Sequence, residues 1–178
     1  MIEYKDKVAL VTGGASGIGK ALAEGLAARG AHVIIADRQA DLAQSVAADL
    51  GGLAIVSDLS DPAAPAALIT EAWAWKGGLD LVCANAGTGL RRPVLKESFG
   101  PDTDRLFAVN MHAPIRMAQA YAAHLIAAGK RGRLMITSSE NALSLPAGVR
   151  RSRISAYAAS KHGVLILAEW LREELAGE

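Results

Sequence analysis

The stretch "TGGASGIG", from Thr12 to Gly19, lies between a strand-like run and a helical pattern. The run before it, "KVALV", is typical of a buried strand, and "GIGKALAEGLAARG" repeats apolar residues at the spacing of one helix face. Glycines suit the turn between them, because a tight turn needs positive φ and a phosphate approaches closest where no Cβ intervenes. The N-terminus of the following helix adds free N–H groups and the positive end of its dipole. The stretch therefore predicts a strand–turn–helix unit that binds an anion.

This turn has two alternative interpretations. Gly14 to Lys20 also fits the first part of a nucleoside-triphosphatase loop, G-x4-G-K. The next position of that loop is Ser or Thr, which holds magnesium, and here it is Ala21, which argues against a triphosphatase. A glycine turn with a structural role alone is the second alternative, and the strand–helix context disfavours it.

Outward from the turn, short apolar runs alternate with longer Ala-rich helical patterns. Strands are expected near 7–12, 32–36, 53–57, 79–84 and 132–138, and helices after each of them, including a long one over 102–128 and a last one from Ser155. Asp61 is expected to cap the helix that follows the third strand, with Pro62 as its first residue. This alternation predicts one α/β domain over 1–178, a doubly wound, Rossmann-like parallel sheet of order 3-2-1-4-5.

Composition limits the partners and the compartment. Apolar residues make up 51% of the chain, and 19 basic against 18 acidic residues leave a net charge of +1, so nothing favours a nucleic-acid or anionic-membrane partner. The single cysteine, Cys83, allows no internal disulfide and fits a reducing compartment. The sequence shows no apolar leader and no membrane-length apolar run, and the four histidines have no metal-ligand spacing. We therefore expect a cytoplasmic protein without a metal site.

An acidic residue, Asp37, stands at the end of the second expected strand. A carboxylate there can accept hydrogen bonds from a ribose 2′-hydroxyl and would repel a 2′-phosphate, which favours NAD over NADP. Arg38 beside it acts in the opposite sense, because a guanidinium can accommodate a phosphate. The alternative role for Asp37 is the N-cap of the next helix.

Together these features resemble the short-chain dehydrogenase/reductase family, and the match covers nearly the whole chain. The motifs fall in family order: "TGGASGIG", "SDLSD" with Asp58 and Leu59, "CANAG" with Asn85, Ala86 and Gly87, "FAVNMHA" with Asn110, "LMITSS" with Ser139, and "YAASK" with Tyr157 and Lys161. In the family, the motif that matches "CANAG" reads Asn-Asn-Ala-Gly, and Ala84 stands in its first position in this chain.

The resemblance implies an NAD(P)-dependent oxidoreductase that transfers hydride between a nicotinamide cofactor and a secondary alcohol or ketone. Tyr157 would be the general acid/base, Lys161 would assist it and bind the nicotinamide ribose, Ser139 would polarise the substrate oxygen, and Asn110 would hold a water. The cofactor would contact Thr12, Gly13, Ser16, Gly17, Ile18, Gly19, Asp37, Arg38, Asp58, Leu59, Asn85, Ala86, Gly87, Tyr157 and Lys161.

Hydride transfer to a ketone requires a proton donor, and a tyrosine beside a lysine can supply one. Hydride transfer to a ketone leaves negative charge on oxygen, so an acid must deliver a proton, and a phenol ionises only near pH 10. Lys161 lies one helical turn after Tyr157, on the same face, where a cation stabilises a phenolate. The alternative is a partly buried tyrosine beside a surface lysine. Ser138 competes with Ser139, because the interval from Ser139 to Tyr157 is longer than usual for the family.

The resemblance also implies a C-terminally shortened member, since the family's lid region usually follows the helix of Tyr157. A fragment, a partner subunit that covers the site, and a non-catalytic dinucleotide-binding or interaction protein are the alternatives. With the lid absent, we expect cofactor binding with weak turnover. We also expect a homodimer through the two long C-terminal helices, which are rich in small residues: Ala113, Ala118, Ala120, Ala122, Ala123, Ala158, Ala159 and Gly163.

Overall fold

Five parallel strands form one sheet in the computed structural model, which describes residues 3–92, 100–144 and 153–177. The strand order is β3-β2-β1-β4-β5, so the predicted doubly wound α/β fold is confirmed. In the central register, Leu10 pairs with Ile34 on one side and with Val82 on the other. The strands are β1 (Val8–Thr12), β2 (His32–Asp37), β3 (Leu53–Val56), β4 (Leu81–Ala84) and β5 (Arg133–Ile136).

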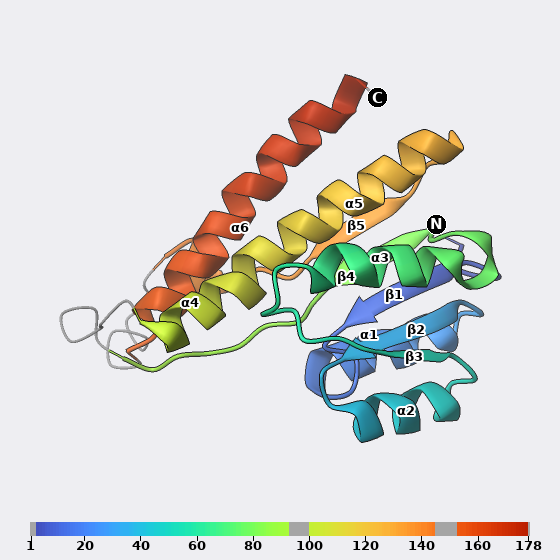
Figure 1. Cartoon of the computed structure of the whole chain (residues 1–178), viewed down its shortest axis with the longest axis horizontal. Helices are drawn as coiled ribbons and strands as arrows, with labels where there is room; N and C mark the ends of the chain where they lie inside the picture. Colours follow the sequence, from blue (N-terminus) through green and yellow to red (C-terminus); the bar gives the residue numbers. More distant parts are fainter. Residues whose placement is uncertain (1–2, 93–99, 145–152, 178) are drawn as a thin grey trace.

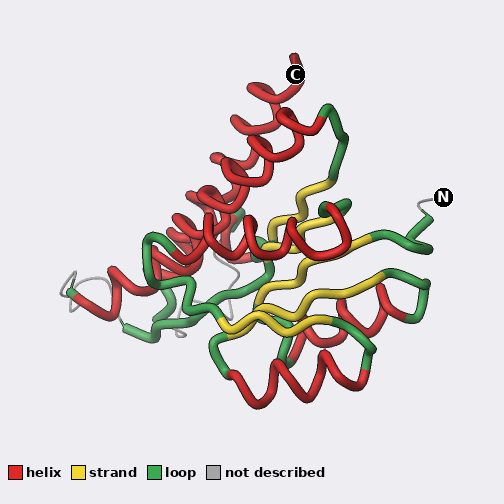
Figure 2. Tube along the Cα trace, turned by 45° about the vertical axis from the view of Figure 1, so that its right-hand side comes forward, coloured by secondary structure: helices red, strands yellow, loops and turns green. Residues whose placement is uncertain are grey.

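Helices cover both faces of this sheet (Figures 1 and 2). Strand β1 shows why: its side chains alternate, so that Val8 and Leu10 join one buried cluster while Ala9 and Val11 join the other. One face packs against α1 (Gly17–Ala27) and α2 (Ala40–Asp49), and the other against α3 (Ala64–Ala74) and α5 (Ala113–Ala128). Helix α6 (Ser155–Glu174) lies on the α5 side (Figure 1).

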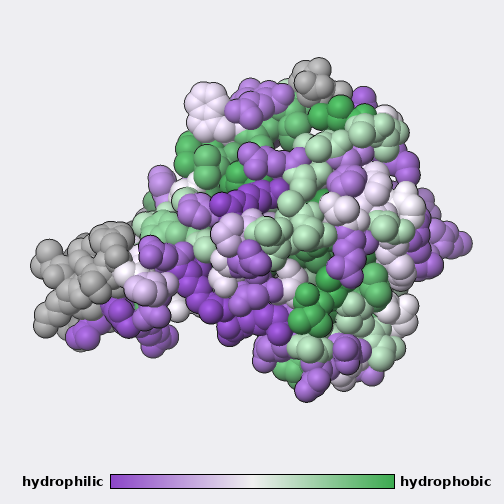
Figure 3. All heavy atoms as spheres, in the orientation of Figure 1, coloured by the Kyte–Doolittle hydropathy of each residue, from purple (hydrophilic) through white to green (hydrophobic). Residues whose placement is uncertain are grey.

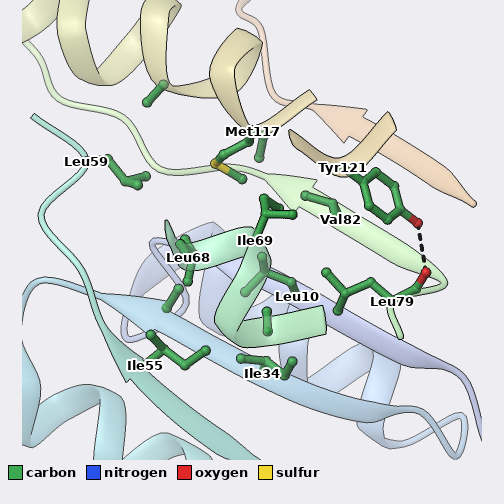
Figure 4. Packing of buried hydrophobic residues seen from close by; sticks show 14 of the residues in the cluster. Leu10, Ile34, Ile55, Leu59, Leu68, Ile69, Leu79, Val82, Met117 and Tyr121 are labelled. Carbon is green, nitrogen blue, oxygen red and sulfur yellow. Dashed lines mark hydrogen bonds between the residues drawn. The ribbon is translucent and has the colours of Figure 1, made fainter. Parts of the chain in front are cut away.

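The cluster on the α3–α5 side joins strands and helices that are distant in sequence (Figure 4). Leu10 and Ile34 are fully buried there against Ile69 of α3 and Met117 of α5. Tyr121 closes one end of the cluster, and its hydroxyl donates to the carbonyl of Leu79 at 3.0 Å. Burial raises the pKa of Tyr121 to about 12, so this phenol stays protonated and keeps its donor role.

Two helix predictions were wrong in detail. Helix α3 begins at Ala64, not at Pro62, because the carboxylate of Asp61 accepts the Ala63 N–H at 2.9 Å and forms a turn before the helix. The segment expected to be one long helix over 102–128 is helical throughout, but it is not a single α-helix. Helix α4 (Pro101–Phe107) leads into a π-helical turn, Ala108–His112, before α5. The π turn contains Asn110, and such turns are frequent at functional sites.

Candidate active site

A cleft of about 480 Å³ opens at the carboxyl edge of the sheet. Its size falls within the usual range of small-ligand pockets. Its wall is formed by the glycine turn, the ends of the strands and α6, as expected for the carboxyl edge of an open parallel sheet. The cleft brings together these residues of the sequence prediction: Gly13, Ser16, Gly17, Ile18, Gly19, Asp37, Arg38, Asp58, Leu59, Asn85, Ala86, Gly87, Tyr157 and Lys161.

The glycine turn leaves room beside the backbone. Gly13 and Gly17 have positive φ, and the Gly13 N–H donates to the Ala36 carbonyl at 2.8 Å, which ties the turn to β2. A Cβ on Gly19 would lie 2.0 Å from the Gly13 carbonyl oxygen, so no side chain can replace this glycine without moving the turn. Ile18 lines the cleft and its side chain is 69% exposed.

Thr12 lies behind the cleft instead of in it. Its side chain is buried, and its Oγ1 accepts the N–H groups of Asn85 and Ala86, both at 3.0 Å. The Asn85 side chain returns a bond to the Thr12 carbonyl at 3.1 Å. Thr12 therefore fixes the segment after β4, and it contributes to the wall through that segment.

Asp37 anchors the turn as well as lining the cleft. One carboxylate oxygen accepts the Ala15 N–H at 3.2 Å, and the other accepts the Gln39 N–H at 3.1 Å. The residue before α2 is Gln39, so the alternative of Asp37 as the N-cap is wrong. Arg38 lines the same end of the cleft, which places both signs of charge there.

Tyr157 and Lys161 both line the cleft from α6, one helical turn apart. Lys161 is only 3% exposed, and its Nζ donates to the Thr137 carbonyl at 2.7 Å. Burial lowers the pKa of Lys161, because the charged form is poorly solvated there. A Cβ on Gly87 would lie 3.6 Å from this Nζ, so the missing side chain keeps the space in front of the lysine open.

Asn110 is fully buried and does not line the cleft. Its amide group clamps the backbone of Thr88, accepting the N–H at 2.8 Å and donating to the C=O at 2.9 Å. It also donates to Ser160 Oγ at 3.1 Å, and Ser160 in turn donates to the Tyr157 carbonyl at 2.8 Å. The side chain of Asn110 thus connects the loop after β4 to the helix of Tyr157 and Lys161.

The two serines after β5 are used differently, and neither lines the cleft. Ser138 Oγ donates to the Lys161 carbonyl at 3.1 Å and so faces α6. Ser139 Oγ accepts from the backbone N–H of Asn141 at 3.3 Å and from its side-chain amide at 3.4 Å. An oxygen that accepts both bonds leaves its own proton free to be donated.

Seven further residues line the cleft that the motifs did not single out. Several directly follow strand ends or motif residues, and Arg105 and Val109 lie four apart near Asn110, a helical spacing that would have placed both on one face. They are Gln39, Ser57, Thr88, Gly89, Arg105, Val109 and Thr137.

In the part of the chain that the structure describes, no three His, Cys, Asp or Glu side chains lie together as a metal site would need. No helix within these ranges is both long and apolar enough to cross a membrane.

A parallel sheet with a glycine turn and a Tyr–Lys pair at one cleft defines a nucleotide-binding α/β protein. The family model for short chain dehydrogenases matches residues 7–178, and the chain belongs to that family. It is similar to 1-deoxy-11-beta-hydroxypentalenate dehydrogenase of Streptomyces avermitilis, with 37% identity over 99% of this chain and 66% of the relative. It is also similar to tropinone reductase-like 1 of Erythroxylum coca, with 40% identity over 95% of this chain and 62% of the relative.

Solved structures match the fold over nearly the whole chain. A short chain dehydrogenase/reductase from Burkholderia phymatum in complex with NAD has a TM-score of 0.90 and 27% identity, over 99% of this chain and 63% of that chain. A blue fluorescent protein from a metagenomic library in complex with NADPH has a TM-score of 0.86 and 30% identity, over 99% of this chain and 71% of that chain. The chain spans about two thirds of the length of the curated relatives it matches.

Proposed function

We propose that the chain is an NAD(P)-dependent oxidoreductase that interconverts a secondary alcohol and a ketone. The observation that carries this proposal is the meeting of the glycine turn with Tyr157 and Lys161 at one cleft. The comparisons support it, because relatives that match nearly the whole of this chain are named dehydrogenases and reductases.

The described residues fit a dinucleotide. Gly17 and Gly19 lie in the first turn of α1, where the backbone N–H groups have no intrahelical partner and a pyrophosphate is stabilised by the helix dipole. Ile18, exposed at the cleft, would lose that exposure under a bound dinucleotide. When bound, the nicotinamide group supplies the hydride acceptor or donor.

The protein's own residues would handle the proton. Tyr157 would give its phenolic proton to the ketone oxygen in the reductive direction and remove it in the oxidative direction. Lys161 would stabilise the phenolate, since one of its N–H groups is held by Thr137 and two remain available. Ser139 would donate to the same substrate oxygen with the proton that Asn141 leaves free.

NAD is the preferred cofactor in this proposal. Asp37 is held at the cleft by two backbone N–H groups, so its charge cannot swing away from a 2′-phosphate at low cost. Titrating both cofactors at one salt concentration tests the preference. Tighter binding of NADP would mean that Arg38, and not Asp37, governs this end of the cleft.

The second part of the proposal is a homodimer through α5 and α6. Ala113 and Ala118 are buried inside the protomer, so they are not available to a partner, contrary to the expectation from small residues. Larger apolar side chains support the contact instead: Ile166, Leu167 and Trp170 are 51%, 37% and 62% exposed on α6. Apolar surface borders α6 in the space-filling view (Figure 3).

Incubation with NAD and a panel of secondary alcohols, followed by absorbance of the reduced cofactor, tests the activity. The expected result is turnover with at least one alcohol that falls about a hundredfold or more in Tyr157→Phe, the scale of a lost general acid/base. Turnover equal in Tyr157→Phe and the unaltered chain would contradict the proposed role. NAD binding without turnover on any substrate would favour a non-catalytic binding protein.

A further inference from the structure

A short 3-10 helical turn, η4 (Glu140–Ala142), follows β5 and has Ser139 as its N-cap. Two hydrogen bonds hold the ends of this segment against α6. The Ser138 hydroxyl donates to a carbonyl of α6 at 3.1 Å, and Nδ1 of His162 bonds the Ala142 carbonyl at 2.8 Å. The position of Ser139 is therefore fixed relative to the helix that carries the proton-transferring residues.

Asn141, in the middle of this turn, donates two hydrogen bonds to one oxygen. Its backbone N–H lies 3.3 Å from Ser139 Oγ, and its side-chain Nδ2 lies 3.4 Å from the same atom. A hydroxyl group has two acceptor sites and one proton. Asn141 fills both acceptor sites of Ser139, so the Ser139 proton cannot point toward Asn141 and is available to another acceptor.

The other end of the same amide group is unpaired. Among the residues that the structure describes, Asn141 Oδ1 is a buried side-chain atom without a hydrogen-bond partner. A buried acceptor without a partner destabilises a fold and calls for an explanation. If the amide were rotated by half a turn, Oδ1 would face Ser139 Oγ and accept its proton. The observed orientation gives up that bond and keeps the hydroxyl proton available.

The shape of the turn does not require the amide. Ser139 already accepts the backbone N–H of Asn141, the usual bond of a serine at the start of a turn. The Asn141 side chain adds only the second and longer bond, and it buries an unpaired oxygen in doing so. An apolar side chain of the same shape would serve a purely structural role better, because it has no polar atom to bury.

On the basis of the proposed oxidoreductase function, we infer that Asn141 is a positioning residue that keeps the Ser139 hydroxyl in its donating state. With both acceptor sites occupied, the hydroxyl presents its proton to the substrate oxygen as negative charge develops there. Asn141 acts through Ser139 and does not itself contact the reacting atoms.

Asn141→Asp is the variant that tests this inference, because it keeps the shape of the side chain and replaces the amide donor by an acceptor. The carboxylate would take the Ser139 proton in a charge-assisted bond. We expect kcat with a secondary alcohol to fall about a hundredfold, the scale of one lost donor to a developing oxyanion. The dissociation constant of NAD, measured by calorimetry, should change less than about twofold. Asn141→Leu, which removes the donor without adding an acceptor, should lower kcat only about threefold.

The same substitution in two serine backgrounds separates positioning from the added charge. In Ser139→Ala the hydroxyl is absent, so Asn141→Asp should cost less than about twofold further. Ser138→Ala is the matched control, because that hydroxyl is bonded to α6, and Asn141→Asp should still cost about a hundredfold there. Urea unfolding gives a readout without turnover. The midpoint of Asn141→Leu should lie at or above that of the unaltered chain, since an unpaired buried acceptor is removed.

The outcomes separate the two claims. No turnover by the unaltered chain on any alcohol overturns the proposed function and this inference with it. A full loss from Asn141→Asp in the Ser139→Ala background overturns the inference alone, because the carboxylate would then act through its charge. Equal small losses in Asn141→Asp and Asn141→Leu, or a lower unfolding midpoint in Asn141→Leu, would also overturn it, because the amide would then serve the turn and not the hydroxyl.

Discussion

At the scale of single residues, Lys161 combines a charge with near-complete burial. Its folded-state pKa lies below the ordinary 10.5, because burial penalises the charged form. Between these two values the unfolded chain binds more protons than the folded one, so the free energy of unfolding rises with pH through that window. Below the window, the cost of burying the ammonium is fully present.

Replacing this lysine therefore has a pH-dependent effect on stability. Lys161→Met should be more stable than the unaltered chain at neutral pH, and the difference should shrink as the pH rises toward about 10. Urea unfolding of both proteins across this range measures the difference. A gap that stays constant or widens with pH would show that Lys161 is not buried as a destabilised cation.

The two serines after β5 give a second test at this scale. Ser139→Ala should lower turnover about a hundredfold, as expected for a lost donor to a developing oxyanion. Ser138→Ala is its neighbouring control, because that hydroxyl is bonded to the Lys161 carbonyl, and turnover should change by less than about fivefold. The reverse order of the two effects in steady-state assays would reassign the donor to Ser138.

At the scale of elements, two glycines of α1 have opposite environments. A Cβ on Gly19 would meet the Gly13 carbonyl oxygen, whereas one on Gly25 would meet only the Arg29 side chain at 3.6 Å. Gly25→Ala should raise the unfolding free energy by about 0.5–1 kcal/mol through helix propensity. Gly19→Ala should lower it by about 1–3 kcal/mol, the cost of forcing the backbone apart. Chemical denaturation of both variants tests this, and equal effects would mean that the turn is not tightly packed.

Elements with a strong period or fixed chemistry were predictable from the sequence. The sheet order followed from the alternation of strands and helices, and most of the cleft residues followed from motifs at strand ends. The π turn at Asn110 was not predictable, because the apolar residues around it keep the spacing of an α-helix. The start of α3 was not predictable for a similar reason. The carboxylate of Asp61 accepts a backbone N–H both when it caps a helix and when it closes a turn.

Arg105 shows another limit of reading a sequence. Its helical spacing places it on one face with Val109, but nothing in that local pattern points to a carboxylate partner. Its ion-pair partner is Asp58, 47 positions away along the chain, which only the fold brings within hydrogen-bond distance.

At the scale of the whole molecule, the proposed homodimer depends on the exposed face of α6. Leu167 lies beside Ile115 and Met111 in a hollow between α6 and the α5 region. Leu167→Asp would bury a charge in the proposed contact. We therefore expect the dissociation constant of the dimer to rise about tenfold or more. Leu42→Asp is the control, because Leu42 is 46% exposed on α2, away from this face. Sedimentation of a monomer for the unaltered chain at micromolar concentration would contradict the dimer.

The measurement that tests the central claim most directly is a calorimetric titration of NAD into the unaltered chain and into Ile18→Asp. Ile18 is exposed at the start of α1, so a carboxylate there leaves the core intact and repels a pyrophosphate at the helix N-terminus. We predict one saturable site per chain, with binding weakened about tenfold or more in Ile18→Asp. Absence of saturable binding, or equal affinity in the two proteins, would contradict a dinucleotide site at the glycine turn.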